Sequence, residues 1–331
     1  MLPYYVTKQK QNTKISYKKE EAMSESYDYT PAPWNKGNFK EAEKAYEKHV
    51  NDCAKAVGQG VAATNLVLPQ ITTQAEHPLI IVVDNTASMG KWVTMIFAKL
   101  GYFDFEAREY LGNDMQVSFM AVGDANYDKF PFQVTEFGSE AQLAENLKKL
   151  VIEGGGGPPC CESYELAMLY CARNVIMPKA IKPIIIFIGD EAFYDYVYQD
   201  QAAKWACVQI AEKKILTSNI IEELKRKFLV YIIRKPYGNQ FLSNRANSID
   251  MQIHHAWVNA LGPRNVALLP DPNRVVDVIF GLLAAATNME EYFWNEVHER
   301  QIKDENGREK LQVILKTLYT VHDIAKLTDG K

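Results

Sequence analysis

The sequence predicts an α/β protein built on one doubly wound, mostly parallel sheet with helices on both faces and one antiparallel edge strand. The first observation is an unbroken apolar run at residues 79–83, typical of a strand that helices cover on both sides. A similar apolar run occupies residues 183–190. The third observation is the alternation of strand and helix patterns over residues 79–287, which favours right-handed crossovers between parallel strands.

The two ends of the chain lie outside this alternation. Residues 1–35 are polar and lack apolar periodicity, so we expect a flexible N-terminal arm. Residues 36–76 form an N-terminal helical extension, because apolar side chains recur at helical spacing between 39 and 57. This helix either packs on the main domain or docks a partner. Residues 289–331 read as a C-terminal helical extension, interrupted around residues 306–307.

The alternating region contains six strand patterns and several helix patterns. Buried strands are predicted at 79–83, 115–122, 183–190, 228–233 and 266–269, and a half-exposed edge strand at 130–137. Helices are predicted at 92–112, 142–150, 202–227, 249–261 and 272–287, with a further helix after Ser163 and a break near residues 217–218. Strands and helices therefore alternate as one doubly wound sheet requires.

Composition excludes two classes of function. The 331 residues are 47% hydrophobic and 24% charged, with a net charge of −4, as in an ordinary soluble globular protein. A small negative charge gives no general attraction for nucleic-acid phosphates, so we expect no nucleic-acid partner. No apolar run reaches membrane-spanning length and no signal-peptide core follows the first lysines. We therefore expect no membrane association and a cytoplasmic location.

Three oxygen-bearing side chains directly follow the first buried strand. Asp84, Thr86 and Ser88 stand at alternate positions there. Side chains at the carboxyl end of a central parallel strand project into the crevice where open α/β sheets bind ligands. A carboxylate and two hydroxyls suit a hard divalent cation such as Mg²⁺. The structural alternative is that Thr86 or Ser88 caps the next helix and Asp84 accepts nearby backbone N–H groups.

Two other stretches point to the same crevice. Asp190 ends the second fully apolar strand pattern and so repeats the design of the first. Residues 154–157 are four glycines, which permit a close approach of the backbone. This loop lacks both the Gly-Lys-Ser/Thr ending of a P-loop and a Gly-x-Gly-x-x-Gly pattern, which argues against nucleotide binding. The three stretches together favour a metal site over a helix cap.

At this point the chain resembles the von Willebrand factor A domain family, over about residues 77–288. Members of this family have a doubly wound, Rossmann-like sheet. They carry a metal-ion-dependent adhesion site made of Asp-x-Ser/Thr-x-Ser, a Thr on a second loop and an Asp on a third. Asp84, Thr86 and Ser88 match the first loop, and Asp190 matches the third. In the branch with the closest likeness the second loop reads Gly-Gly-Gly-Asp-Thr-Pro-Glu, and residues 154–162 here read Gly-Gly-Gly-Gly-Pro-Pro-Cys-Cys-Glu.

The second loop therefore departs from the family pattern, because it contains no Thr. Glu162 and Ser163 are the available protein oxygens, and a water molecule is the alternative. Two carboxylates and two hydroxyls remain, which are enough for Mg²⁺ because this ion commonly keeps several waters. The resemblance thus implies Mg²⁺, with Mn²⁺ or Ca²⁺ as alternatives. The predicted metal ligands are Asp84, Thr86, Ser88, Asp190, Glu162 and Ser163.

The resemblance implies binding, so we expect no enzymatic activity. The cation would take one ligand from a protein partner that presents an Asp or Glu carboxylate. Intracellular members often act as adaptors in multiprotein assemblies, some alongside AAA-type ATPases, which implies an adaptor or scaffold role here. One alternative is a Mg²⁺-dependent phosphohydrolase with Asp84 as nucleophile, although Thr86 stands where such enzymes want an Asp as general acid. Another is a structural subunit of a homo-oligomer with a vestigial metal site.

Overall fold

A computed structural model of the chain describes residues 66–100, 103–158, 160–237, 244–301 and 305–322, together with 44–45, 47–49, 51–53 and 55. Its centre is a six-stranded sheet. The six strands are β2 (Leu79–Asp84), β3 (Val117–Val122), β4 (Phe132–Val134), β7 (Ile184–Gly189), β11 (Leu229–Arg234) and β12 (Val266–Leu268). They lie in the order β12-β11-β7-β2-β3-β4, all parallel except β4, which pairs antiparallel with β3 at the edge. The predicted α/β class, mostly parallel sheet and antiparallel edge strand are confirmed.

Helices account for most of the remaining described chain. They are η2 (Ala87–Met89), α2 (Lys91–Leu100), α3 (Asp104–Leu111), α4 (Ala141–Lys149), α5 (Tyr164–Asn174), α6 (Gln199–Trp205), α7 (Thr217–Lys225), α8 (Asn244–Leu261), η3 (Pro263–Asn265), η4 (Pro272–Arg274), α9 (Val275–Thr287), α10 (Glu290–Gln301) and α11 (Glu305–Leu318). Three short pairs complete the structure: β1 (Ile71–Thr72) with β6 (Val175–Ile176), β5 (Cys161–Glu162) with β8 (Ala192–Phe193), and β9 (Tyr196–Tyr198) with β10 (Lys214–Leu216). None of these pairs belongs to the central sheet.

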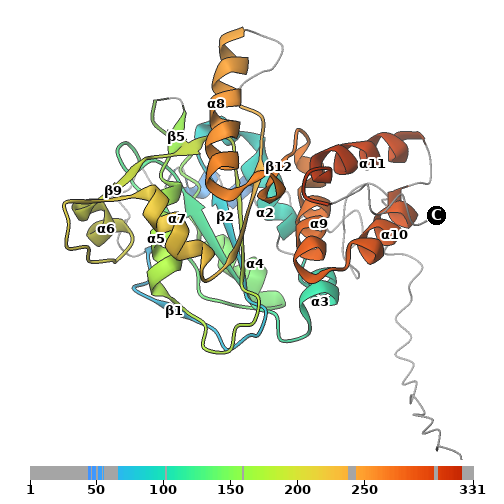
Figure 1. Ribbon diagram of the computed structural model, residues 1–331, viewed down its shortest axis with the longest axis horizontal. Coiled ribbons are helices and arrows are strands. Elements are labelled where there is room, and N and C mark those ends of the chain that lie inside the picture. The colour runs from blue at the N-terminus through green and yellow to red at the C-terminus, as the bar shows by residue number, and fades with distance from the viewer. Residues whose placement is uncertain are drawn as a thin grey trace, which may run out of the picture.

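The sheet separates two apolar cores, because successive side chains of a strand point to opposite faces. On one face Ile81 and Val83 of β2 join side chains from α2, α3, α4 and α9. On the other face Ile80 and Val82 join side chains from α5, α6, α7 and α8. In Figure 1 the sheet accordingly stands between α5 and α7 on one side and α3 and α9 on the other. The continuous apolar runs of the strands follow from this double coverage.

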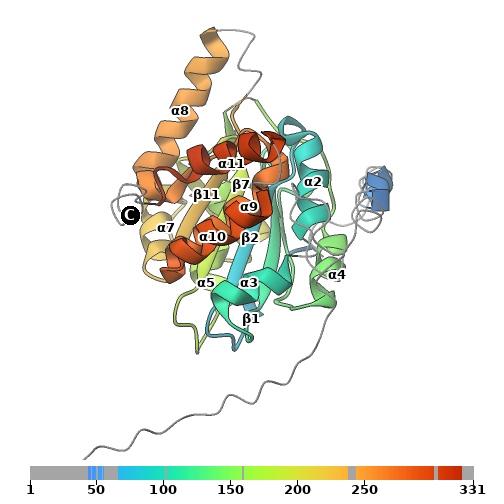
Figure 2. The same ribbon diagram turned by 90° about the vertical axis from the view of Figure 1, so that its right-hand side faces the viewer.

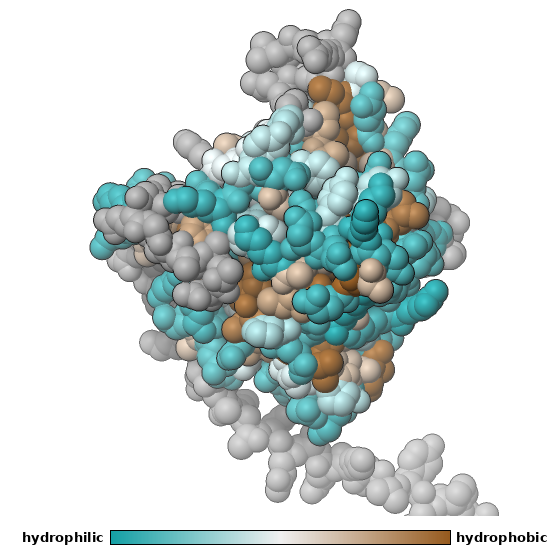
Figure 3. Space-filling view, turned by 90° about the vertical axis from the view of Figure 1, so that its left-hand side faces the viewer, coloured by the Kyte–Doolittle hydropathy of each residue, from teal (hydrophilic) through white to brown (hydrophobic). Residues whose placement is uncertain are grey.

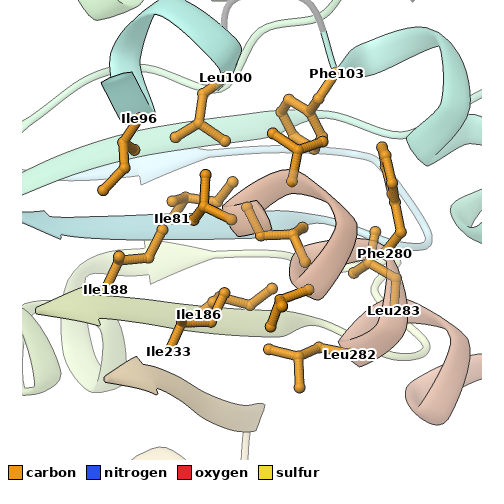
Figure 4. Packing of buried hydrophobic residues seen from close by; sticks show 14 of the residues in the cluster. Ile81, Ile96, Leu100, Phe103, Ile186, Ile188, Ile233, Phe280, Leu282 and Leu283 are labelled. Atoms are coloured by element: carbon orange, nitrogen blue, oxygen red, sulfur yellow. The ribbon is translucent and has the colours of Figure 1, made fainter. Parts of the chain in front are cut away.

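Figure 4 shows how the first of these cores is packed. Isoleucines from β2, β7 and β11 meet aliphatic side chains of α2 and the aromatic and leucine side chains of α9. Each fully buried side chain of this size contributes about 1.5–3 kcal/mol by leaving water. These contacts fix the three strands whose carboxyl ends carry the polar residues described below.

The helix α9 is apolar on all sides, and such a helix must be covered all round. The sheet covers one side, and α10 and α11 lie over the other, as Figure 2 shows. Gly281 permits the closest contact, since a Cβ there would lie 2.2 Å from Leu318 Cδ1. The two C-terminal helices outside the strand–helix alternation therefore share the main apolar core.

Three predicted elements differ from the structure. The single helix at 92–112 is described as α2 and α3, because Asp104 begins a new first turn in which its carboxylate pairs with Arg108 at 2.7 Å. The single helix predicted at 202–227 was wrong. In the structure this stretch contains the end of α6, an irregular segment that includes β10, and α7. Val208 and Ile210 lie three and four residues after the buried Trp205 and Ala206, so they continue the helical spacing although their segment is not helical. The break near 217–218 is where α7 begins.

The edge strand predicted to be half-exposed is fully buried. Phe132 and Val134 pack in the core on the α5 side. The amide of Gln133 covers the other side, where it donates to Val151 O at 2.8 Å and accepts from Val151 N at 2.7 Å. The predicted interruption at 306–307 lies inside α11, so this prediction was wrong.

The structure describes only part of the two predicted terminal extensions. The predicted arm at 1–35 and residues 323–331 lie outside the described residues. The described residues between 44 and 55 are helical, within the predicted N-terminal helix. Among the described helices there is none with the length and apolar character needed to cross a bilayer. The face shown in Figure 3 is mainly hydrophilic, with apolar residues in small scattered patches.

Candidate functional site

The candidate site lies where the strand order reverses. From β2 the chain adds β3 and β4 on one side, and then returns to add β7, β11 and β12 on the other. The carboxyl ends of β2 and β7 therefore sit side by side at a switch point, the usual ligand position of open α/β sheets. Asp84 is the last residue of β2, and Asp190 directly follows β7.

Two hydroxyls stand in a chain of close contacts between the two carboxylates. Thr86 Oγ1 donates to Asp84 Oδ1 at 2.6 Å, and Ser88 Oγ donates to Asp190 Oδ1 at 2.8 Å. The two hydroxyl oxygens lie 3.0 Å apart. Because each hydroxyl has one proton and gives it to a carboxylate, the lone pairs of both oxygens remain to accept a cation. The structure thus brings together Asp84, Thr86, Ser88 and Asp190.

The structural alternative, in which Thr86 or Ser88 caps a helix and Asp84 accepts backbone N–H groups, is correct only for Asp84. Thr86 stands at the N-cap of η2, but its side chain makes no capping bond. Asp84 Oδ1 does accept the backbone N–H of Thr86, at 2.9 Å. The hydroxyls therefore serve the carboxylates instead of a helix end.

The two carboxylates are buried together. Asp84 and Asp190 have no exposed surface. Burial first, and then the negative charge of Asp190, raise the pKa of Asp84 from 3.8 to about 7. Two buried like charges cost free energy unless a positive charge balances them. A positive charge beside Asp84 and Asp190 would therefore stabilise their ionised forms.

Glu162 lies against the first loop but outside the hydrogen-bonded chain. It is 2% exposed, and its Oε2 has no hydrogen-bond partner. Burial and the charge of Asp84 raise the pKa of Glu162 to about 10. Gly156 lies close to both groups, since a Cβ there would be 3.0 Å from Glu162 Oε1 and 3.3 Å from Thr86 Cβ. Glu162 is thus a buried acid that packs against the same glycine as Thr86, with one oxygen unpaired.

Ser163 is turned away from the other predicted ligands. Its Oγ accepts the backbone N–H of Ala125 at 2.9 Å, and its own N–H donates to Gly123 O at 2.9 Å. These bonds fasten the start of α5 to the loop after β3. The structure therefore does not bring Ser163 into the chain between Asp84 and Asp190.

The glycine loop is pressed onto the first loop by backbone contacts. Gly155 O accepts from Ala87 N at 2.8 Å, and Gly156 N donates to Asp128 Oδ1 at 2.7 Å. Gly156 has φ +119, a conformation that other L-residues rarely adopt. A Cβ on Gly157 would lie 2.0 Å from Asp124 Oδ2. Close packing therefore accounts for the last three glycines, and a positive φ of +65 accounts for Gly154.

Two further acids line the surroundings and hold loops. Asp124 Oδ1 accepts from Asn126 N at 2.8 Å, and its Oδ2 accepts from Tyr194 Oη at 2.8 Å, so it acts as a turn carboxylate. Glu191 Oε2 accepts from Cys160 N at 3.1 Å, and burial followed by the charge of Asp190 raises the pKa of Glu191 to about 8. Both carboxyl groups therefore hold loops that surround the site.

Two residues at the site escaped sequence reasoning. Tyr164 Oη donates to Asp84 Oδ2 at 2.7 Å, and the ring is held between Phe187 and Trp257. Gly189 makes room for it, because a Cβ there would lie 1.7 Å from Tyr164 Oη. Lys235 Nζ lies 2.6 Å from Asp190 Oδ2. Lys235 directly follows a buried parallel strand, which is the same signal that identified Asp84 and Asp190.

Within the described part of the chain, no group of three or more His, Cys, Asp or Glu side chains is arranged to hold a metal ion. A site of two carboxylates and two hydroxyls is not a group of that kind, since it takes half of its oxygens from Ser and Thr. The hard oxygen donors present still suit Mg²⁺.

Comparisons with known proteins give little further information. No protein-family model and no curated protein matches the chain. Two crystal structures of the pilus adhesin SpaC from Lactobacillus rhamnosus GG align with TM-scores of 0.46 and 0.43, at 12% and 11% identity over 68% and 70% of this chain. Proximal thread matrix protein 1 from the mussel byssus aligns with a TM-score of 0.42, at 11% identity over 66%. The aligned part is 31% of SpaC and 49% of the mussel protein, so this chain is similar to part of each.

Proposed function

We propose that the chain is a Rossmann-like domain of the von Willebrand factor A type, and that it binds a protein partner through a divalent cation at a metal-ion-dependent adhesion site. The observation that carries the proposal is the chain Asp84–Thr86–Ser88–Asp190 at the switch point of the sheet, in which both hydroxyls donate their protons to carboxylates. The cation is Mg²⁺, with Mn²⁺ or Ca²⁺ as alternatives.

The residues fit such an ion in charge and in chemistry. Asp84, Asp190, Thr86 and Ser88 would hold it, and all four present hard oxygens. Burial and the charge of Asp190 raise the pKa of Asp84, so a positive charge would stabilise its ionised form, and Oε2 of buried Glu162 has no hydrogen-bond partner. A divalent ion would supply that charge, and Glu162 would contact it directly or through water.

The residues of this chain prepare the site for a partner carboxylate. Tyr164 holds Asp84 in one orientation through its second oxygen. The glycine loop closes one side of the site, and Tyr127 stands beside Gly157 with 62% of its surface exposed. A bound cation supplies a Lewis acid with a coordination position for an Asp or Glu carboxylate of the partner. The neighbouring Tyr127 then offers a large contact surface to the same partner.

Binding fits this site better than catalysis does. Asp84 has no exposed surface, and its two oxygens already accept from Thr86 and Tyr164, so it is poorly placed to attack a phosphoester. This geometry favours an adaptor or scaffold role, in an AAA-type ATPase complex or another multiprotein assembly, over the phosphohydrolase alternative. The metal site also distinguishes the proposal from a homo-oligomer subunit whose site is vestigial.

Calorimetric titration with Mg²⁺ and Mn²⁺, followed by capture of partners with and without EDTA, tests the proposal. The variant is Asp84→Asn. Its matched control is Asp114→Asn, because Asp114 lies at the opposite end of β3 and its exposed carboxylate accepts from Glu76 N. We expect the wild type and Asp114→Asn to bind the metal and the same partners, and Asp84→Asn and EDTA to abolish both.

Two outcomes would contradict the proposal. If the wild type takes up no divalent ion at millimolar concentration, the site is vestigial. If partners are captured equally in EDTA and by Asp84→Asn, binding uses another surface. Turnover of a phosphoester that disappears in Asp84→Asn would instead support the enzyme alternative.

A further inference from the structure

Lys235 places a positive charge inside the candidate cation site. Its Nζ donates to Asp190 Oδ2 at 2.6 Å and to the backbone oxygen of Ser88 at 2.9 Å. The ammonium therefore bridges the first and third loops, and it touches two of the four residues proposed to hold the metal. Its 17% side-chain exposure shows that it lies near the rim and not in the apolar core.

The position of Lys235 follows from the topology. It comes directly after β11, which pairs in parallel with β7, so its backbone lies beside Asp190. Lys235 N donates to Gly189 O at 2.8 Å and fixes that backbone. Only the flexible side chain is left to move, and its four-carbon stem can carry the ammonium from Asp190 to the solvent.

The charge balance indicates what this ammonium does. Asp84 and Asp190 are both without exposed surface, and Lys235 is the cation that contacts Asp190. A divalent ion held by Asp190 and Ser88 would be repelled by an ammonium that lies 2.6 Å from the second oxygen of the same carboxylate. The two cations therefore exclude one another at Asp190.

We propose that Lys235 is a built-in competitor for the divalent cation: it neutralises Asp190 in the metal-free protein, and metal binding requires its ammonium to leave Asp190. This inference rests on the metal site of the proposed function and deepens it. Lys235 lowers the affinity of the site for metal and keeps the metal-free form folded. It thereby determines the cation concentration at which the site becomes competent for a partner.

Calorimetric titration with Mn²⁺ of the full chain and three variants tests this inference. Lys235→Met removes the charge and keeps the length of the side chain, and Lys235→Arg keeps the charge. The matched control is Lys225→Met, because Lys225 precedes β11 and so lies at the opposite end of the sheet, where it pairs with Glu222. We expect Lys235→Met to bind Mn²⁺ at least about tenfold more tightly than the wild type. Lys235→Arg and Lys225→Met should bind no more tightly than the wild type.

Thermal unfolding supplies a second readout that separates competition from a structural role. In EDTA, Lys235→Met should unfold at a lower temperature than the wild type, because Asp190 loses its counterion. Saturating Mn²⁺ should remove this difference. A lysine that only stabilises the fold would leave the variant less stable with and without metal.

The outcomes distinguish failure of this inference from failure of the proposed function. Wild-type binding with unchanged or weaker binding by Lys235→Met overturns the inference and leaves the metal site standing. Binding by Lys235→Met alone supports the inference and shows that the ammonium replaces the metal in the natural protein. Absence of binding in every variant overturns both.

Discussion

Replacing Asp84 by Asn is expected to stabilise the metal-free protein while abolishing its response to metal. The substitution is nearly isosteric and removes one of two buried negative charges. Asn Oδ1 can still accept from the backbone and hydroxyl of Thr86, as Asp84 Oδ1 does. Its amide nitrogen would face Tyr164 Oη, which must then accept a hydrogen bond where it now donates.

The magnitude follows from the electrostatics of Asp84. A rise in its pKa from 3.8 to about 7 means that ionised Asp84 costs the folded state about 4 kcal/mol at pH 8. Because the pKa of Asp84 is higher in the folded than in the unfolded protein, its contribution to stability is fully present below pH 3.8 and is lost as the pH rises through about 7. At pH 8 the ionised carboxylate is therefore unfavourable in the folded state. The weaker hydrogen bond between Tyr164 and the uncharged Asn side chain reduces this gain in stability by about 1–3 kcal/mol. The net gain is about 1–3 kcal/mol, or about 2–6 °C in the unfolding midpoint at about 2 °C per kcal/mol.

The assay is thermal unfolding at pH 8, first in EDTA and then in about 5–10 mM Mg²⁺. Above the dissociation constant, each tenfold increase in Mg²⁺ concentration stabilises a protein that binds the ion by roughly 1.4 kcal/mol. The wild type should gain stability with Mg²⁺, and Asp84→Asn should be more stable in EDTA and indifferent to the metal. The reasoning is refuted if Asp84→Asn is destabilised in EDTA and still responds to Mg²⁺. Asp84 would then act as a structural hydrogen-bond acceptor and not as a metal ligand.

Three further outcomes follow from the same geometry. Tyr164→Phe leaves one buried oxygen of Asp84 unpaired and should destabilise the protein by about 2 kcal/mol, measured by chemical denaturation. Gly156→Ala meets Glu162 Oε1 at 3.0 Å and should weaken metal binding, as titration would show. Gly154→Ala is a matched control, because its positive φ also strains the backbone but its Cβ has no atom within 4 Å, and it should leave metal binding unchanged. In EDTA, stability should fall as the pH rises from about 4.5 to about 8, because burial raises the pKa of Glu165 to about 8; Glu165→Gln should reduce this slope by up to about 1.4 kcal/mol per pH unit.

Much of the fold could be predicted from the sequence because its central strands are covered on both faces. The run 79–83 and the run before Asp190 are apolar without interruption, and both became central strands. The segment around Val208 and Ile210 could not be assigned in the same way. Its burial comes from tertiary packing, and buried irregular chain can imitate helical spacing by chance.

Some residues of the candidate site could be predicted from the sequence and others could not. Asp84 and Asp190 could be placed because parallel strands end at one edge, so that sequence position predicts spatial proximity. Ser163 and Glu162 could not be separated from sequence, because the path of the loop decides that Ser163 binds Ala125 N and that Glu162 packs against Gly156. Lys235 was missed although it also follows a central strand. A lysine is not an oxygen ligand, so the chemistry that identifies Asp84 and Asp190 does not point to it.

A crystal structure of the protein grown with Mn²⁺, with anomalous diffraction recorded for the metal, tests the central claim most directly. We expect one anomalous peak among the side-chain oxygens of Asp84, Thr86, Ser88 and Asp190, with Lys235 Nζ withdrawn from Asp190. The same crystals without such a peak, with the Thr86 and Ser88 hydroxyls still bonded to the two carboxylates, would contradict it.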